Sequence, residues 1–99
     1  MPKSIPTPTI GEVLKSEFLV PLELTPYRLA KDLGVSTRTI LDLIHDRRRL
    51  SVEMALKLSK YLGMSEKFWL NLQADIDVRN KKQSMKKELD KIQPIARLA

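Results

Sequence analysis

The chain has no cysteine, a single histidine, only three glycines and no long apolar run. Without cysteine there is no disulfide, no thiolate nucleophile and no cysteine-bound metal, and a reducing compartment fits this composition. His45 alone cannot complete a Ser-His-Asp set, and it makes a poor metal site beside three arginines. No glycine-rich loop is present to cradle a phosphate. We therefore expect no catalytic residue, no cofactor and no bound metal, and we predict that the protein is not an enzyme.

Apolar residues never run to the length of about 18 that a membrane-spanning helix needs. The first residues also lack the hydrophobic region of a signal peptide. The 99 residues are 42% apolar and 30% charged, which is typical of one soluble globular domain. We expect a cytoplasmic protein that does not contact a membrane.

Basic residues outnumber acidic ones by 18 to 12, for a net charge of +6. The excess is uneven. Residues 1–25 carry two basic and three acidic side chains, residues 26–63 carry eight and four, and residues 64–99 carry eight and five. The basic surplus begins at residue 26, and it makes an anionic partner plausible.

Residues 26–45 have the pattern of two short helices joined by a tight turn. Thr25 can cap a helix that starts with Pro26, where the missing N–H costs nothing. Gly34 can end that helix in the left-handed conformation, and Ser36 can cap a second helix that ends near His45. Each helix has one inward apolar face at helical spacing, made of Leu29, Ala30 and Leu33 in the first and of Ile40, Leu43 and Ile44 in the second.

The second helix turns long polar side chains outward. At about 100° per residue, Arg38, Asp42 and His45 fall on one stripe opposite the apolar face. Arg38 lies in the first turn, where the helix dipole disfavours a cation, and this suggests a partner outside the fold. The pattern indicates a helix-turn-helix that places its second helix in the major groove of DNA. The alternative is a surface hairpin of an ordinary helical bundle.

Residues 46–50 follow this helix with three consecutive arginines, Arg47, Arg48 and Arg49. The segment is too short and too charged to be core. Arginines just past a recognition helix are well placed to bind phosphates, which positions a protein on DNA without reading its sequence. The alternative is a solubilising loop.

Three further helices are expected around the hairpin. Thr9 and Glu12 match a capping box that begins a helix ending at Pro21, after an extended arm at residues 1–8. Ser51 caps a helix that ends at Gly63, with Met54, Ala55, Leu58 and Leu62 turned inward. Ser65 caps the next helix, whose core face is Phe68, Trp69, Leu72 and Ile76.

The helix after Ser65 also has a second apolar side, Leu70, Ala74 and Val78. A helix that is apolar on two sides needs two partners. We expect a break at residues 79–82 and a last short helix capped by Ser84, with Met85, Leu89 and Ile92 on one face and Pro94 at its end. The spare face, continued by Met85 and Leu89, predicts a dimer interface. The alternative is that the helix at residues 84–92 folds back over it.

Three stretches resemble one family. Phe68–Gln73, which spells Phe-Trp-Leu-Asn-Leu-Gln, is the most specific of them. Residues 9–14 are similar to the family's N-terminal signature, and Tyr27 through Arg48 are similar to its helix-turn-helix. Together they resemble the HigA-type antitoxins of the XRE class. The resemblance implies an all-α, five-helix phage-repressor-like (lambda repressor-like) domain at residues 9–80, followed by a C-terminal helix and tail at 81–99.

By the same resemblance, the protein binds an inverted-repeat operator in double-stranded DNA as a homodimer, represses its own operon and neutralises a small basic RelE-like ribonuclease toxin. The resemblance implies that its base-reading residues are Ser36, Thr37, Arg38 and Asp42. We expect its phosphate contacts to be Arg28, Thr39, Arg47, Arg48 and Arg49. A free-standing repressor without a toxin is a second interpretation, and a protein-interaction module that uses the helix after Ser65 is a third.

Two departures from the family pattern stand out. Thr9-Ile10 replaces the usual His-Pro, and His45-Asp46 replaces the common Asn-Gly before the arginines. The lost glycine predicts a changed loop shape. The mildly acidic N-terminal segment, with Glu12, Glu17 and Glu23, is the surface on which a basic toxin is expected. The alternative is that these glutamates only solvate the first helix.

Overall fold

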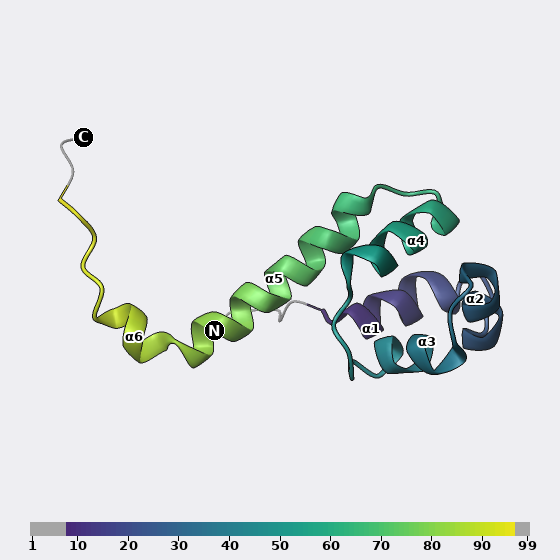
Figure 1. The fold of residues 1–99 in the computed structure, drawn as a ribbon, viewed down its shortest axis with the longest axis horizontal. Helices are drawn as coiled ribbons and strands as arrows, with labels where there is room; N and C mark the ends of the chain where they lie inside the picture. Colours follow the sequence, from purple (N-terminus) through teal and green to yellow (C-terminus); the bar gives the residue numbers. More distant parts are fainter. Residues whose placement is uncertain (1–7, 97–99) are drawn as a thin grey trace, which may run out of the picture.

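The computed structural model describes residues 8–96, which form helices joined by turns and contain no strand. The predicted all-α fold is confirmed. The helices occur in the order α1 (Ile10–Val13), η1 (Leu14–Leu19), α2 (Pro26–Leu33), α3 (Thr37–Ile44), α4 (Val52–Leu62), α5 (Glu66–Ser84) and α6 (Lys86–Asp90) (Figure 1). The expected arm at residues 1–8 and the end of the tail at 97–99 lie almost wholly outside the described part of the chain.

The first helix begins with the predicted capping box. The Thr9 hydroxyl accepts a hydrogen bond from the Glu12 amide at 3.0 Å, and the Glu12 carboxylate accepts one from the Thr9 amide at 2.8 Å. After Val13 the helix continues as the π-helix η1, which periodicity did not predict. It ends at Leu19, just before Pro21, as expected.

The two helices of the hairpin have the predicted bounds and caps. The Thr25 hydroxyl accepts the Arg28 amide at 3.0 Å, and the Ser36 hydroxyl accepts the Thr39 amide at 3.1 Å. Gly34 has a φ of 73° and ends α2 in the left-handed conformation. The same logic holds for α4, which is capped by Ser51 and ended by Gly63.

The core lies where α1, η1 and α2–α5 meet, and it fixes the hairpin on the rest of the domain. Trp69 is fully buried, as predicted, and its ring packs against Phe18 and Phe68 at centroid distances of 5.5 and 5.1 Å. Phe68 was expected on the core face but is 43% exposed, because it packs edge-on to Trp69 from the rim. The other fully buried large side chains are Leu14, Leu29, Ile40, Leu43, Leu50 and Leu58.

The predicted break at residues 79–82 is wrong. α5 continues without interruption to Ser84, because arginine and lysine are good helix formers and a charged run does not by itself end a helix. Ser84 is also not a cap. It is the last residue of α5, and its hydroxyl donates to the Lys81 carbonyl at 3.0 Å. Ile92 follows the end of α6 rather than lying within it.

The C-terminal part of α5 and all of α6 project from the globular part, and the molecule has extents of 54 × 31 × 24 Å (Figure 1). α6 continues outward along the direction of α5, so the alternative in which residues 84–92 fold back over the domain is wrong. None of the helices described at residues 8–96 combines the length and the apolar character that crossing a bilayer requires.

Candidate nucleic-acid interface

α3 exposes the predicted polar residues along one side. Arg38 is 77% exposed at the side chain, and Thr37 and Thr39 are half-buried beside it. Ser36 caps this helix, as predicted. Its hydroxyl accepts the Thr39 amide and shares a second hydrogen bond of 2.9 Å with the Thr39 hydroxyl. The start of α3 is therefore internally organised before any ligand arrives.

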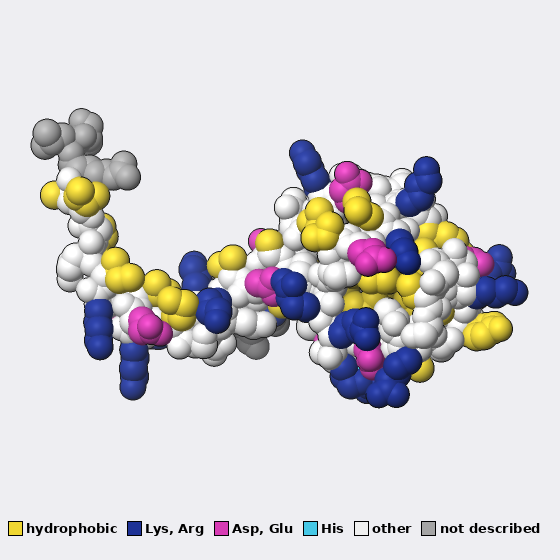
Figure 2. Space-filling view, in the orientation of Figure 1, with side chains coloured by type: hydrophobic (Ala, Val, Ile, Leu, Met, Phe, Trp, Pro, Cys, Tyr) yellow, Lys and Arg dark blue, Asp and Glu magenta, His cyan; other side chains and the backbone are white. Residues whose placement is uncertain are grey.

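Asp42 lies at the centre of an arginine cluster. Its carboxylate accepts hydrogen bonds from the Nε atoms of Arg38 and Arg47, both at 3.2 Å, and an Arg48 Nη2 atom is 3.9 Å away. Only 15% of the Asp42 side chain is exposed. Figure 2 shows Lys and Arg side chains gathered over α3 and the loop that follows it. We call the four residues Arg38, Asp42, Arg47 and Arg48 the Asp42 clamp.

The Asp42 carboxylate is ionised in this setting. Desolvation opposes its charge, but the hydrogen bonds from Arg47 and Arg38 and the attraction of both guanidinium groups outweigh that effect and lower its pKa. Arg47 and Arg38 each use only Nε toward Asp42, so their Nη groups still have donors for an external acceptor. The clamp aims the arginines and leaves them able to bind an anion.

The loop at residues 46–50, which we call the arginine loop, turns at Asp46. Asp46 has a φ of 57°, the left-handed conformation that glycine usually supplies. Its carboxylate accepts a hydrogen bond of 2.9 Å from the Gly11 amide, which ties the turn to α1. Asp46 therefore adopts the left-handed conformation that the glycine of the family pattern would allow, and its side-chain hydrogen bond stabilises this turn.

Gly11 permits close contact between α1 and α3. A Cβ atom at this position would lie 2.1 Å from the Ile44 carbonyl oxygen and 2.9 Å from that of Leu43. No other residue type fits there without moving one helix. This contact joins segments more than 30 residues apart, and sequence reasoning did not find it.

The far end of the arginine loop is fastened to α5. Gln73 is only 7% exposed, and its Oε1 accepts a hydrogen bond of 2.8 Å from the Leu50 amide. Its Nε2 donates to Asp77 at 2.9 Å, and Asp77 in turn pairs with Arg49. The bonds from Arg49 and Gln73 lower the pKa of Asp77. The sequence did not predict the roles of Gln73 and Asp77. The only signal was the polar residue Gln73 at the end of the Phe68–Gln73 block.

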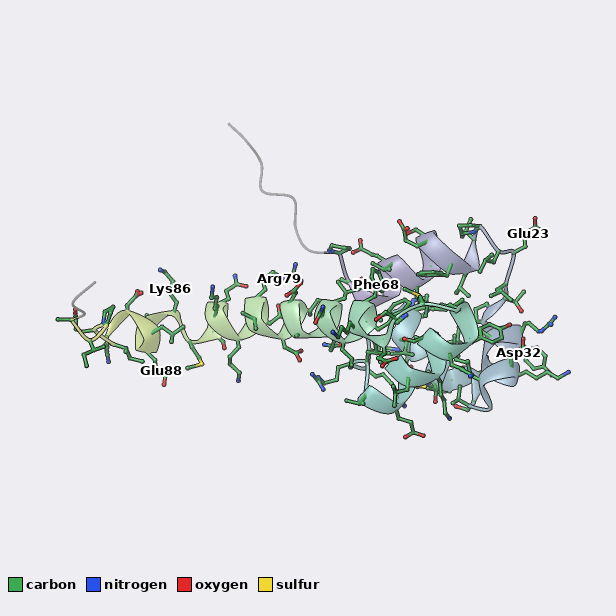
Figure 3. All side chains as sticks on the ribbon, turned by 90° about the horizontal axis from the view of Figure 1, so that it is seen from above. Glu23, Asp32, Phe68, Arg79, Lys86 and Glu88 are labelled. Carbon is green, nitrogen blue, oxygen red and sulfur yellow. The ribbon has the colours of Figure 1, made fainter. Side chains whose placement is uncertain are left out.

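Arg28 lies on α2, in a second polar group. Its Nε donates to Asp32 at 2.8 Å, and the Tyr61 hydroxyl of α4 donates to the same carboxylate at 2.5 Å. The hydrogen bond from Tyr61 and then that from Arg28 lower the pKa of Asp32. Figure 3 shows Asp32 at the end of the domain farthest from α6. The group therefore lies apart from the tail.

The spare face of α5 is open in the structure. Val78 is 53% exposed, Ala74 is exposed, and Leu70 is half-buried. Beyond α5, Met85 is half-buried and Leu89 is exposed. These five residues lie on the projecting part of the chain or at its base, and no described segment covers Val78.

Residues 16–69 match the family model described as helix-turn-helix. An uncharacterised helix-turn-helix-type transcriptional regulator of Haemophilus influenzae is 41% identical over 70 residues, which cover 71% of this chain and 65% of that protein. Antitoxin HigA-1 of Vibrio cholerae is 34% identical over 88% of this chain and 82% of its own length. The chain therefore spans slightly less than two thirds of the first relative and most of the second.

Among solved structures, the chain is similar to the Pseudomonas aeruginosa antitoxin HigA, which was determined with the higBA promoter. The TM-score is 0.87 at 32% sequence identity, and the match covers 92% of this chain and all of that one. The similarity extends beyond residues 16–69 and includes most of the projecting helices.

Proposed function

The chain belongs to the helix-turn-helix family, in the XRE-type class that includes the HigA antitoxins, and from this we propose that it is an antitoxin that represses its own operon as a dimer and neutralises a small RelE/HigB-like ribonuclease. It is a DNA-binding protein and not an enzyme. The observation that carries the proposal is the Asp42 clamp, which unites the exposed side of α3 with the arginine loop. In a loop that only increases solubility, arginine side chains would not have to be ordered around a carboxylate that is shielded from water.

In this proposal α3 enters the major groove and Arg38 reads a guanine. Arg38 is the most exposed member of the clamp, and a bidentate contact to guanine discriminates against other bases by about 1–3 kcal/mol. Ser36, Thr37 and Asp42 complete the base-reading set. Arg28, Thr39 and the three arginines of the arginine loop contact phosphates. Asp42 has two roles, because it holds Arg38 and can accept a hydrogen bond from cytosine.

The test is binding to the intergenic DNA upstream of the gene. We expect Arg38→Ala to relax specificity at one position of each half-site in a binding-site selection. Arg48→Ala is the matched variant. It also removes an arginine of the Asp42 clamp, but this arginine is assigned to a phosphate and not to a base. It should weaken all sequences about equally and lower the salt slope by about 1. Identical specificity profiles for the two variants would refute the division of roles.

We propose that the dimer forms through the spare face of α5 and its continuation, Leu70, Ala74, Val78, Met85 and Leu89. The exposure of Val78 and the outward course of α6 support this. A twofold dimer on an inverted repeat places its recognition helices about 34 Å apart, one turn of DNA. Val78→Lys should give the mass of a single chain in sedimentation at micromolar concentration. Val20→Lys makes the same change at a valine that is exposed outside the spare face, and it should leave the dimer mass unchanged. A wild-type monomer that binds single half-sites would exclude the dimer.

The toxin surface is proposed on the N-terminal helix and the turn after it, where Glu17 and Glu23 are exposed. RNA-binding toxins are basic, and acidic side chains raise the rate of association with them. We expect Glu17→Lys with Glu23→Lys to slow association while operator binding is kept. The same charge change at Glu53 and Glu66, on other surfaces, is the control.

Expression of the adjacent small gene without this protein decides between an antitoxin and a free-standing repressor. Arrested growth that this protein reverses would support the antitoxin. Normal growth would indicate a repressor without a toxin. In either case we propose that the protein is cytoplasmic and associated with the nucleoid. Failure to bind the upstream DNA, with the spare face of α5 still capturing a partner, would instead favour the interaction module.

A further inference from the structure

A cleft of about 340 Å³ lies between the arginine loop and the middle of α5. Its walls carry four arginines, namely Arg79 of α5 and the three arginines of the loop, together with the Asn80 amide. Among the described residues, Asp46 and Asp77 are the only ones that bring a carboxylate to it. The cleft therefore has a positive balance of charge and many N–H donors, which suits an anion with several acceptor oxygens.

The cleft is held open by bonds within the fold. Gln73 fixes the loop through the Leu50 amide, and Asp77 fixes Arg49 against α5. At the other end Asp46 is tied to Gly11. Because these contacts fasten both ends of the arginine loop, the spacing between the loop and α5 is set before any ligand binds. A preformed site loses less conformational entropy on binding than a set of mobile side chains does.

The donors that face the cleft are not all used. Arg47 binds Asp42 through Nε alone, and the side-chain amide of Asn80 forms no hydrogen bond within residues 8–96. The two carboxylates are already occupied, Asp46 by the Gly11 amide and Asp77 by Gln73 and Arg49. In Figure 3 Arg79 projects from the edge of α5 on which α1 also lies. An incoming anion would meet guanidinium and amide donors.

We propose that this cleft is a second phosphate-binding site, in which α5 contributes Arg79 and Asn80 to the DNA interface. The inference rests on the DNA binding proposed above and extends it. Arg47 and Arg48 belong both to the cleft and to the Asp42 clamp on α3, so a strand whose bases meet α3 continues past the cleft. The ligand is a phosphate group, and the operator backbone is its source.

The first test uses one isosteric charge change at two places on α5. Asn80→Asp adds a carboxylate to the cleft. Asn71→Asp makes the same change nine residues earlier, which at about 100° per residue is the opposite side of the helix, where Asn71 is exposed. We expect Asn80→Asp to lower the slope of log K against log salt by about 0.9 for each half-site, the value for one phosphate contact, and Asn71→Asp to leave it unchanged.

A second pair tests the arginine itself. Arg79→Gln should lower the salt slope by about one contact for each half-site, whereas Lys82→Gln, which removes the same charge from a residue outside the cleft, should not. Sedimentation of all four variants at the assay concentration confirms the wild-type mass, and circular dichroism confirms the helix content. Equal slopes for the cleft variants and their controls would overturn the inference.

The outcomes separate this inference from the proposed function. If the wild-type protein shows no preference for its upstream DNA, the proposed function fails. If the wild type binds but Asn80→Asp and Arg79→Gln behave like their controls, only the cleft assignment fails. Titration of inorganic pyrophosphate into the DNA-free protein tests the source of the phosphate. Saturable binding that Asn80→Asp abolishes, with an unchanged operator slope, would assign the cleft to a free phosphorylated ligand and overturn the backbone assignment.

Discussion

Replacement of Gly11 by alanine is expected to destabilise the protein far more than the size of a methyl group suggests. The added Cβ would lie 2.1 Å from the Ile44 carbonyl oxygen, whereas ordinary contact begins at about 3.4 Å, so α1 and α3 must separate by about 1 Å. The atoms it meets belong to the backbone and cannot rotate away. Overpacking typically costs about 1–3 kcal/mol. We expect a loss of about 3 kcal/mol or more, a large part of a typical domain stability of about 5–15 kcal/mol.

Gly63→Ala is the matched control. Gly63 has a φ of 67° and no atom within 4 Å of a built Cβ, so the substitution there costs only the left-handed conformation, about 1–2 kcal/mol. Urea unfolding followed by circular dichroism gives both free energies of unfolding. A loss at Gly11 no larger than the loss at Gly63 would refute the close approach of α1 and α3. Because the Gly11 amide also binds Asp46, operator affinity should fall for Gly11→Ala even at temperatures where the variant stays folded.

Two further outcomes are expected from buried or shielded polar groups. Gln73→Leu leaves the Leu50 amide without its acceptor, so it should lower the free energy of unfolding by about 1–3 kcal/mol. Asn71→Leu is the control and should leave the free energy of unfolding unchanged. Urea unfolding measures both. The pKa of Asp42 is lower in the folded state than in the unfolded state, so its contribution to stability is present above the unfolded pKa and is lost as the pH falls through the folded one. Asp42→Asn should therefore be less stable than the wild type above about pH 4, and the difference should disappear as the pH falls further. Unfolding measured across this pH range checks it, and equal stability of the two proteins at neutral pH would contradict the clamp.

Local chemistry made the hairpin predictable. The caps at Thr25 and Ser36 and the end of α2 at Gly34 depend on residues within a few positions of each other, and all three were found from the sequence. Apolar spacing likewise placed Leu29 and Ile40 in the core. The part of the site that depends on these elements, the exposed stripe of α3, followed directly from them.

Contacts between distant segments were not predictable in this way. In the sequence Gln73 does not differ from other polar residues of a helix. It accepts a hydrogen bond from the Leu50 amide only because the arginine loop packs against α5 in the folded chain. The bond between Asp42 and Arg38 joins residues four apart on one stripe of a helix, but the bond between Asp42 and Arg47 depends on how the loop turns. The continuation of α5 to Ser84 differs from the predicted break because the helix propensity of arginine and lysine outweighs the repulsion within the charged run.

The Asp42 clamp also bears on the timing of side-chain ordering. A free arginine on a protein surface samples many rotamers, and immobilising a long side chain at an interface costs about 0.5–1.5 kcal/mol. Arg38 and Arg47 are already restrained by Asp42 in the free protein, so part of that entropy is lost when the chain folds. Association with DNA can then be fast and can proceed with little rearrangement of these two side chains, while their Nη groups exchange water for phosphate or base.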